Sequence, residues 1–172
     1  MNEAAASELT RPREAEFGAV YAALRAQIFS LCLHLTQVRA DAEDALQDTF
    51  LAVHRALKDF RGEAELKTWV YRIAIRSALA RRARSRRHAG LELSTATEDP
   101  RPGVEASVAA RLEAQRLATA MGRLSADHRA VLSLFAVDGL SHSEIAQVLG
   151  IKEGTVWSRL HLARKKLTEL LR

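Results

Sequence analysis

The chain has 172 residues, of which 48% are hydrophobic and 27% are charged, and its net charge is +5. This length and composition fit one average domain or two small ones, and the positive charge favours a polyanionic partner. No window approaches the roughly 20 apolar residues of a membrane span, the N-terminus lacks a signal-peptide pattern, and a single cysteine excludes an internal disulfide. We therefore expect a cytoplasmic protein without direct membrane insertion.

The first predicted element is a long core helix. The first dozen residues are small and polar and are expected to fray, with Pro12 marking their end. From Phe17 to Leu35 apolar residues recur at the helical period, and the stripe widens until the last turns look almost fully buried. Cys32 lies in this stretch and is expected to act as a small apolar core residue, because it has no partner for a metal site.

The next predicted helix, DAEDALQDTFLAVHRAL over residues 41–57, carries an acidic face. Asp41 is a good N-cap, and the core face is predicted to hold Leu46, Phe50, Val53 and Leu57. The acidic face holds Asp41, Asp44, Gln47 and Asp48. Compensation of the helix dipole explains one or two acids, but Asp44 and Asp48 form a like-charged i,i+4 pair, which favours a basic partner surface. Nothing here provides the burial or metal ligation of catalytic carboxylates.

A short loop and a basic helix are predicted over Asp59–Arg87. The loop, residues 59–65, contains Gly62, and from Leu66 to Gly90 there are eight Lys or Arg and no Asp or Glu. Trp69, Arg72 and Arg76 share one helix face, where an aromatic ring beside guanidinium groups can stack bases and neutralise phosphates. The alternative is that Trp69 and Tyr71 belong to the core and that the charges form a solvated face.

A change of composition divides the chain. Residues 88–103 read HAGLELSTATEDPRPG, which is typical of a linker. We therefore predict one domain over residues 14–88, a linker over 89–106 and a second domain over 107–172. The second domain is predicted to begin with a helix that ends near Met121 and is apolar at Val108, Leu112 and Leu117. A second helix over 126–137 follows, with Ser125 as its N-cap and Asp138-Gly139 at its end.

The last stretch, SHSEIAQVLGIKEGTVWSRLHLARKKLTELLR, has the pattern of a helix-turn-helix. Ala146 is small where the two helices approach, and Gly150 lies where the turn needs a positive φ. The apolar positions are Ile145, Leu149, Ile151, Val156 and Leu160. The alternative is an ordinary helical hairpin. The second helix, about Glu153–Leu170, would enter a major groove, where Thr155, Trp157, Ser158 and Arg159 would reach bases or phosphates and Lys152, Arg164, Lys165 and Lys166 would engage phosphates.

Taken together and in this order, these motifs resemble the two conserved domains of a bacterial extracytoplasmic-function sigma factor of the sigma-70 family. The resemblance covers Phe17–Arg87 and Val108–Leu171. It implies an all-α fold, in which a sigma region 2 helical bundle and a sigma region 4 helix-turn-helix are joined by a flexible linker. It also implies a binding protein, without catalytic residues, metal or cofactor, that binds core RNA polymerase and directs promoter-specific transcription initiation. Family members are commonly controlled by an anti-sigma factor, which can hold them at the inner membrane.

The resemblance assigns roles to the residues that match the family motifs. Docking on the β′ clamp helices of the polymerase is implied for Asp41, Asp44, Gln47 and Asp48, and the β subunit is a further implied contact. Recognition and opening of the −10 element is implied for Phe60, Arg61, Gly62, Glu63, Trp69, Tyr71, Arg72 and Arg76. Recognition of the −35 duplex is implied for Lys152, Glu153, Thr155, Trp157, Ser158, Arg159, His161, Arg164 and Lys165. Three residues depart from the common family pattern and leave the promoter sequence open: Arg76, Trp157 and Leu162.

Two other functions stay open at this point. A free-standing helix-turn-helix repressor has no use for the acidic face or for the stretch of Trp69 and the arginines. A sigma mimic that binds a sigma antagonist and never contacts promoters is kept open by Trp157 and Leu162. An enzyme has no support, because the sequence holds no phosphate-binding glycine loop, metal-ligand cluster or nucleophile–base pair.

Overall fold

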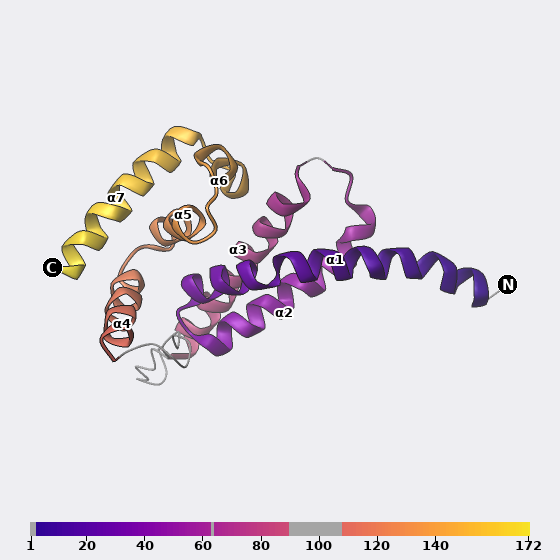
Figure 1. Ribbon diagram of the computed structural model, residues 1–172, viewed down its shortest axis with the longest axis horizontal. Coiled ribbons are helices and arrows are strands. Elements are labelled where there is room, and N and C mark those ends of the chain that lie inside the picture. The colour runs from indigo at the N-terminus through magenta and orange to yellow at the C-terminus, as the bar shows by residue number, and fades with distance from the viewer. Residues whose placement is uncertain (1–2, 63, 90–107) are drawn as a thin grey trace.

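The computed structural model describes residues 3–62, 64–89 and 108–172, and these residues form helices and no strands (Figure 1). The α-helices are α1 Glu3–Thr36, α2 Arg39–Ala56, α3 Leu66–Ala89, α4 Val108–Gly122, α5 Ala126–Ala136, α6 His142–Leu149 and α7 Glu153–Leu171, with a 3-10 turn at Leu57–Asp59. The all-α prediction is therefore confirmed. Glu63 and nearly all of the predicted linker lie outside the described residues.

Helices α1, α2 and α3 pack against one another as a three-helix bundle (Figure 1). Their buried faces include Leu31 and Leu35 of α1, Val53 of α2 and Val70 of α3. The predicted core stripe of α1 is confirmed, but the helix begins at Glu3 and Pro12 lies within it. The prediction of frayed residues up to Pro12 therefore differs from the structure, because the Ala- and Glu-rich segment has a high intrinsic helix propensity.

The turn between α1 and α2 corrects the predicted start of α2. Gln37 adopts a left-handed φ of 67°, and its backbone N–H donates to the Leu33 carbonyl at 2.9 Å, so the chain reverses within two residues. The N-cap of α2 is Val38, without a side-chain cap, and the predicted cap Asp41 lies in the first turn. On the core face Phe50 and Val53 are buried as expected. The small residues Ala42, Ala45 and Thr49 complete that face, while Leu46 and Leu57 are only half-buried.

Helices α5, α6 and α7 confirm the predicted helix-turn-helix arrangement. The Ser125 hydroxyl accepts from the His128 N–H at 3.2 Å, as an N-cap should, and Gly150 ends α6 with a φ of 66°. Ser141 and Glu144 form a reciprocal capping box at the start of α6. The apolar residues predicted for α4 are largely solvent-exposed, with 75% exposure at Val108, 57% at Leu112 and 46% at Leu117.

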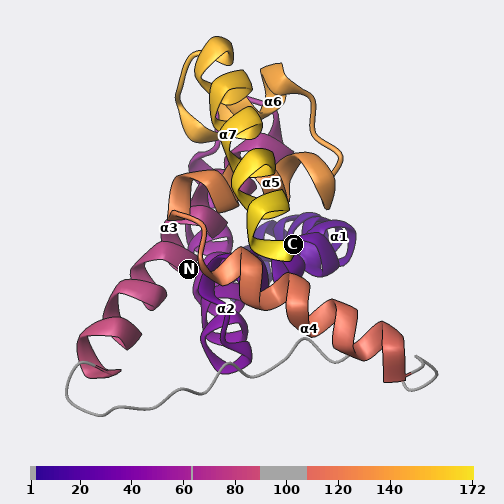
Figure 2. The same ribbon diagram turned by 90° about the vertical axis from the view of Figure 1, so that its left-hand side faces the viewer.

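The two helical bundles pack directly on each other. Helix α1 contacts α5 and helix α3 contacts α6, and the two views agree on this arrangement (Figures 1 and 2). Buried residues of both bundles belong to one hydrophobic cluster, from Val20 in α1 to Ala163 in α7. The sequence did not predict how the two bundles are placed relative to each other, and the structure shows that they are in contact.

Two expectations about the first bundle are tested by burial and hydropathy. Cys32 is fully buried, and burial raises the pKa of its thiol to about 12, which confirms it as a small core residue. In contrast to the expectation, the segment Glu16–Thr36 is long and apolar enough to cross a membrane, with a mean hydropathy of 1.3. One such helix is weak evidence for a span, because core helices of soluble proteins have the same property.

Candidate functional site

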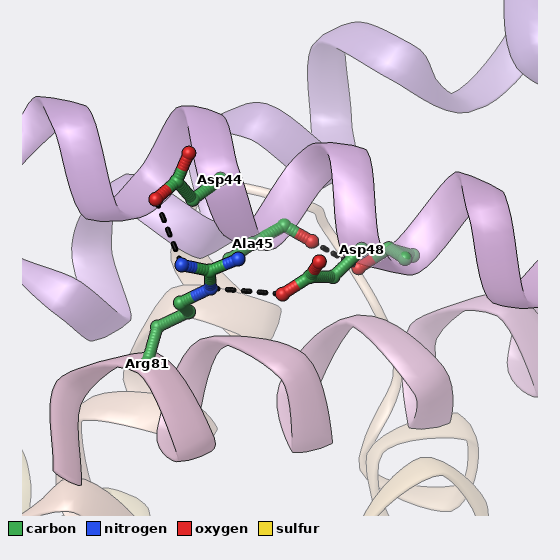
Figure 3. A network of polar contacts seen from close by, with 5 residues as sticks. Asp44, Ala45, Asp48 and Arg81 are labelled. Carbon is green, nitrogen blue, oxygen red and sulfur yellow. Dashed lines mark hydrogen bonds and ion pairs between the residues drawn. The ribbon is translucent and has the colours of Figure 1, made fainter. Parts of the chain in front are cut away.

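The acidic face of α2 is partly neutralised by an arginine of α3. Arg81 donates from Nη1 to Asp44 Oδ2 and from Nε to Asp48 Oδ2, each at 2.8 Å (Figure 3). The bond to Asp48 is the main reason that the pKa of Arg81 is raised. Both carboxylates stay accessible, with 51% of the Asp44 side chain and 41% of the Asp48 side chain exposed. Arg81 thus reduces the repulsion between Asp44 and Asp48. The sequence did not indicate this contact, because Arg81 lies on a different helix from the two aspartates.

The loop before α3 forms a cleft beside the aromatic side chains. Phe60 packs on Trp69 with ring centroids 5.0 Å apart, and Gly62 adopts a φ of 74°. The cleft has a volume of about 300 Å³ and is lined in part by Phe60, Arg61, Trp69 and Arg72. Trp69 is half-buried, so the structure places it between the two sequence alternatives of core residue and stacking platform.

Two residues of the same predicted surface contact the second bundle. Tyr71 is fully buried, and its hydroxyl donates to Asp138 Oδ1 at 3.2 Å. Arg72 donates to the Gln147 carbonyl from Nε at 3.1 Å and from Nη2 at 2.8 Å. Burial raises the pKa of the Asp138 carboxyl to about 6, and burial also raises the pKa of Tyr71. Arg72 and Arg76 are both exposed.

Helix α7 and its N-cap residue present the side chains predicted to read duplex DNA. Trp157 is 63% exposed, Ser158, His161 and Lys165 are also exposed, and Thr155 is half-buried. Lys152 and Glu153 are exposed at the start of the helix. This surface therefore combines an indole, hydroxyls and cations at the end of the helix that would enter a major groove.

Residues outside α7 hold parts of this surface, and sequence reasoning missed them. Asp127, in the first turn of α5, pairs with Arg159 at 2.6 Å. The Arg164 guanidinium lies over the Phe135 ring, 4.7 Å from its centroid. The His142 ring stacks on Phe135, with ring centroids 5.5 Å apart. These partners come from α5 and α6, so no local pattern in the α7 segment could indicate them.

A buried arginine joins the bundles and was also missed. Arg129 of α5 is fully buried and donates to the carbonyls of Met121, Gly122 and Leu124 at the end of α4, at 2.8–3.0 Å. Its Nη1 donates to the Leu35 carbonyl at the end of α1, at 3.0 Å. Carbonyl ends of two helices thus surround the guanidinium, and their dipoles favour a cation there. The only sign of this contact in the sequence was an arginine within the apolar run of α5.

Comparison with known proteins agrees with the domain order. The family model for "Sigma-70 region 2" matches residues 20–88, and the model for "Sigma-70, region 4" matches residues 114–167. The RNA polymerase sigma factor CnrH of Cupriavidus metallidurans is 38% identical over 140 residues, which cover 76% of this chain and 73% of the relative. The ECF RNA polymerase sigma factor SigM of Mycobacterium tuberculosis is 35% identical over 147 residues, which cover 84% of this chain and 71% of the relative.

Two solved structures are similar over both bundles. The sigma factor RpoE from Bartonella quintana, in complex with the anti-sigma factor NepR, has a TM-score of 0.75 and 25% identity, covering 91% of this chain and 96% of that chain. CnrH in complex with the cytosolic domain of CnrY has a TM-score of 0.69 and 29% identity, covering 92% of this chain and 88% of that chain. Within the residues described here, no group of three or more His, Cys, Asp or Glu could hold a metal ion.

Proposed function

Because the chain belongs to the extracytoplasmic-function branch of the sigma-70 family, we propose that it binds core RNA polymerase and selects promoters through a −10 strand and a −35 duplex. The observation that carries this proposal is the presence of region 2 and region 4 in one chain, in family order. Region 2 is formed by α1–α3 and region 4 by α4–α7. The chain acts as a binding protein in the bacterial cytoplasm and needs no cofactor.

The energy of promoter opening supports a polymerase-dependent role. Opening about ten base pairs at roughly 1.4 kcal/mol per stacking step requires on the order of 14 kcal/mol. Stacking of a base on an aromatic side chain returns about 1–3 kcal/mol, so Phe60, Trp69 and Tyr71 together cannot supply that energy. The chain must therefore use the binding energy of a larger assembly.

We assign polymerase docking to the acidic face of α2. Asp44 and Asp48 each keep about half of the side chain accessible although Arg81 contacts them, and Gln47 is exposed beside them. A basic surface of the β′ clamp helices could therefore pair with the free carboxylate oxygens. The exposed apolar side chains of α4, Val108, Leu112 and Leu117, are our candidate contact for the β subunit, because exposed apolar patches mark interaction surfaces.

The −10 strand is assigned to the cleft beside Trp69, and the −35 duplex to α7. Phe60, Arg61 and Trp69 line a cleft of about 300 Å³ that can take an unstacked base. Trp157, Ser158 and Lys165 are exposed on the helix that enters the major groove. Control by an anti-sigma factor is proposed because two similar sigma factors were solved with such partners, and membrane retention would then depend on that partner.

Reconstitution with core polymerase tests the proposed function. We expect run-off transcripts from a subset of genomic promoters, and mapping their start sites gives the −10 and −35 sequences. Asp44→Asn combined with Asp48→Asn should weaken core binding while leaving helicity unchanged. The asparagines keep an oxygen for Arg81 and remove the charge, which makes this pair cleaner than a change to lysine.

The same experiment separates the two other functions. A free-standing repressor would bind duplex promoter DNA tightly without core polymerase. A sigma mimic would bind an anti-sigma factor and give no run-off transcripts with core polymerase. Core affinity that is equal in the asparagine variant and in the wild-type chain would contradict the docking assignment.

A further inference from the structure

Trp157 stands out among the four residues of α7 that were expected to reach bases or phosphates. It is 63% exposed, and its indole N–H has no hydrogen-bond partner among the described residues. The other three are engaged or covered. Thr155 is half-buried, the Ser158 hydroxyl donates to the Thr155 carbonyl at 3.0 Å, and Arg159 is paired with Asp127. Of these four side chains, the indole ring therefore offers the largest unengaged surface to the base edges.

Side chains from the other helices of region 4 support the indole ring. His142 of α6 meets Trp157 in a T-shaped arrangement, with ring centroids 6.3 Å apart. The His142 ring also stacks on Phe135 of α5, and the Arg164 guanidinium of α7 lies over that same Phe135 ring. Because aromatic pairs prefer such defined geometries, this row of contacts favours one orientation of the indole on the surface of α7.

The chemistry of an indole decides which feature of a base pair it can read. It has one N–H donor, no acceptor and no charge. It therefore cannot make the bidentate contact by which arginine or lysine recognises guanine, and it cannot neutralise a phosphate. Its apolar ring matches the C5-methyl group of thymine, which marks that base in the major groove. The exposed ring at the start of the recognition helix thus fits a thymine better than a guanine.

We propose that Trp157 makes −35 recognition depend on the C5-methyl group of one thymine in the major groove. This inference rests on the proposed function, which assigns α7 to the −35 duplex. Burying one methyl group against the ring corresponds to about a fourfold difference in affinity. Deoxyuridine lacks this methyl group, whereas 5-methylcytosine presents it at the same place in the groove. Methylation of a cytosine at that position would therefore raise the affinity of the complex with core polymerase for the promoter.

The test uses the full chain assembled with core polymerase and a promoter duplex that the run-off experiment identifies. Each thymine of the −35 element is replaced in turn by deoxyuridine, which removes only the methyl group. In a second series, each T·A pair of the element is replaced by a C·G pair that carries either cytosine or 5-methylcytosine. Competition binding followed by fluorescence anisotropy gives the relative affinities. Both series change the DNA alone, so their results do not depend on the folding of a protein variant.

Protein variants then assign the methyl effect to Trp157. Trp157→Ala should lose the effect, and Trp157→Phe should keep it because an apolar ring remains. Trp157→Arg should lose the effect and gain a preference for guanine. Val137→Ala is the matched control, because Val137 is an apolar residue of the same region that is 48% exposed, and this variant should keep the wild-type response to deoxyuridine. Circular dichroism confirms that each variant is folded.

We expect one thymine at which deoxyuridine lowers the affinity about fourfold, and at which 5-methylcytosine binds about fourfold more tightly than cytosine. A wild-type affinity that no deoxyuridine changes would overturn the proposal, as would an equal loss in the wild-type chain and in Trp157→Ala. A −35 element without any thymine would overturn it as well. Absence of run-off transcription contradicts the proposed function itself, whereas a complex that transcribes and does not respond to the methyl groups contradicts only the role of Trp157.

Discussion

The two candidate DNA surfaces differ in what holds their side chains. On α7, Trp157 is 63% exposed, and the contact that fixes its neighbour Arg159 comes from Asp127 within the same region. On α3, Tyr71 and Arg72 are held by region 4. The candidate duplex surface is therefore held within its own region, whereas two residues of the candidate single-strand surface are held by the other region.

This difference suggests an order of events at a promoter. An exposed α7 can contact a major groove while the regions are still packed together, because none of its candidate contacts is used for closure. Tyr71 and Arg72 of region 2 are bonded to Asp138 and Gln147 while the regions are packed together. We therefore expect duplex recognition to be insensitive to closure and strand capture to depend on it.

The largest effect is expected for Arg129→Met, which removes the shared anchor of the two regions. Four hydrogen bonds from the guanidinium would be lost, and at about 1 kcal/mol per bond the free energy of unfolding should fall by about 4 kcal/mol. The Leu35 carbonyl would keep Arg82 as a donor, and the Met121 carbonyl would keep the Leu124 N–H. Urea unfolding followed by circular dichroism measures this. Arg111→Met, at an exposed position of α4, should change it by less than about 0.5 kcal/mol. A similarly small loss in both variants would show that Arg129 is not an anchor.

The second effect separates the surfaces by the type of DNA that they bind. Trp69→Ala should weaken binding of a single strand by about 1–3 kcal/mol, because one stacking platform is lost, and should leave duplex binding unchanged. Trp157→Ala should do the reverse and alter the preferred −35 sequence. Anisotropy titrations with matched single- and double-stranded probes measure both. If Trp69→Ala weakened both probes equally, Trp69 would be a core residue, which is the alternative that its half-burial leaves open.

Contacts between residues close in the sequence could be predicted from it, whereas contacts between residues far apart in the sequence could not. The helix-turn-helix was predicted well, because Gly150 and the apolar positions of α6 and α7 lie within one short window. Arg81 with Asp44 is 37 residues apart, and Arg129 with Leu35 is 94 apart, so no periodicity indicates them. The start of α2 was misplaced because Gln37, rather than a glycine, adopts the left-handed conformation in the preceding turn.

A third effect is expected when the pH is lowered, and it concerns only the packing of the two regions against each other. Burial is the main cause that raises the pKa of the Asp138 carboxyl from its ordinary 3.8 to about 6, while the bond from Tyr71 and the charge of Lys67 oppose the rise. The closed form therefore binds this proton more tightly than the open form does. Closure should be strongest below about pH 4, weaken as the pH rises to about 6, and change little above that.

Scattering of the free chain at about pH 5 and about pH 7.5 measures the acid effect, with the more compact form expected at the lower pH. Asp138→Asn is the control, because it removes the titrating group and should remove the pH dependence. A dependence that persists in that variant would assign the effect to groups other than Asp138.

The smallest effect is expected at the contact that supports the duplex reader. Asp127 is 62% exposed in its pair with Arg159, so Asp127→Ala should lower the free energy of unfolding by less than about 1 kcal/mol. The larger consequence is for DNA, since Arg159 would lose the partner that fixes its direction at the groove. We expect −35 discrimination to weaken while single-strand binding and scattering stay at wild-type values. A change in scattering would mean that the two regions are coupled through α5, and that the duplex reader is not independent of closure.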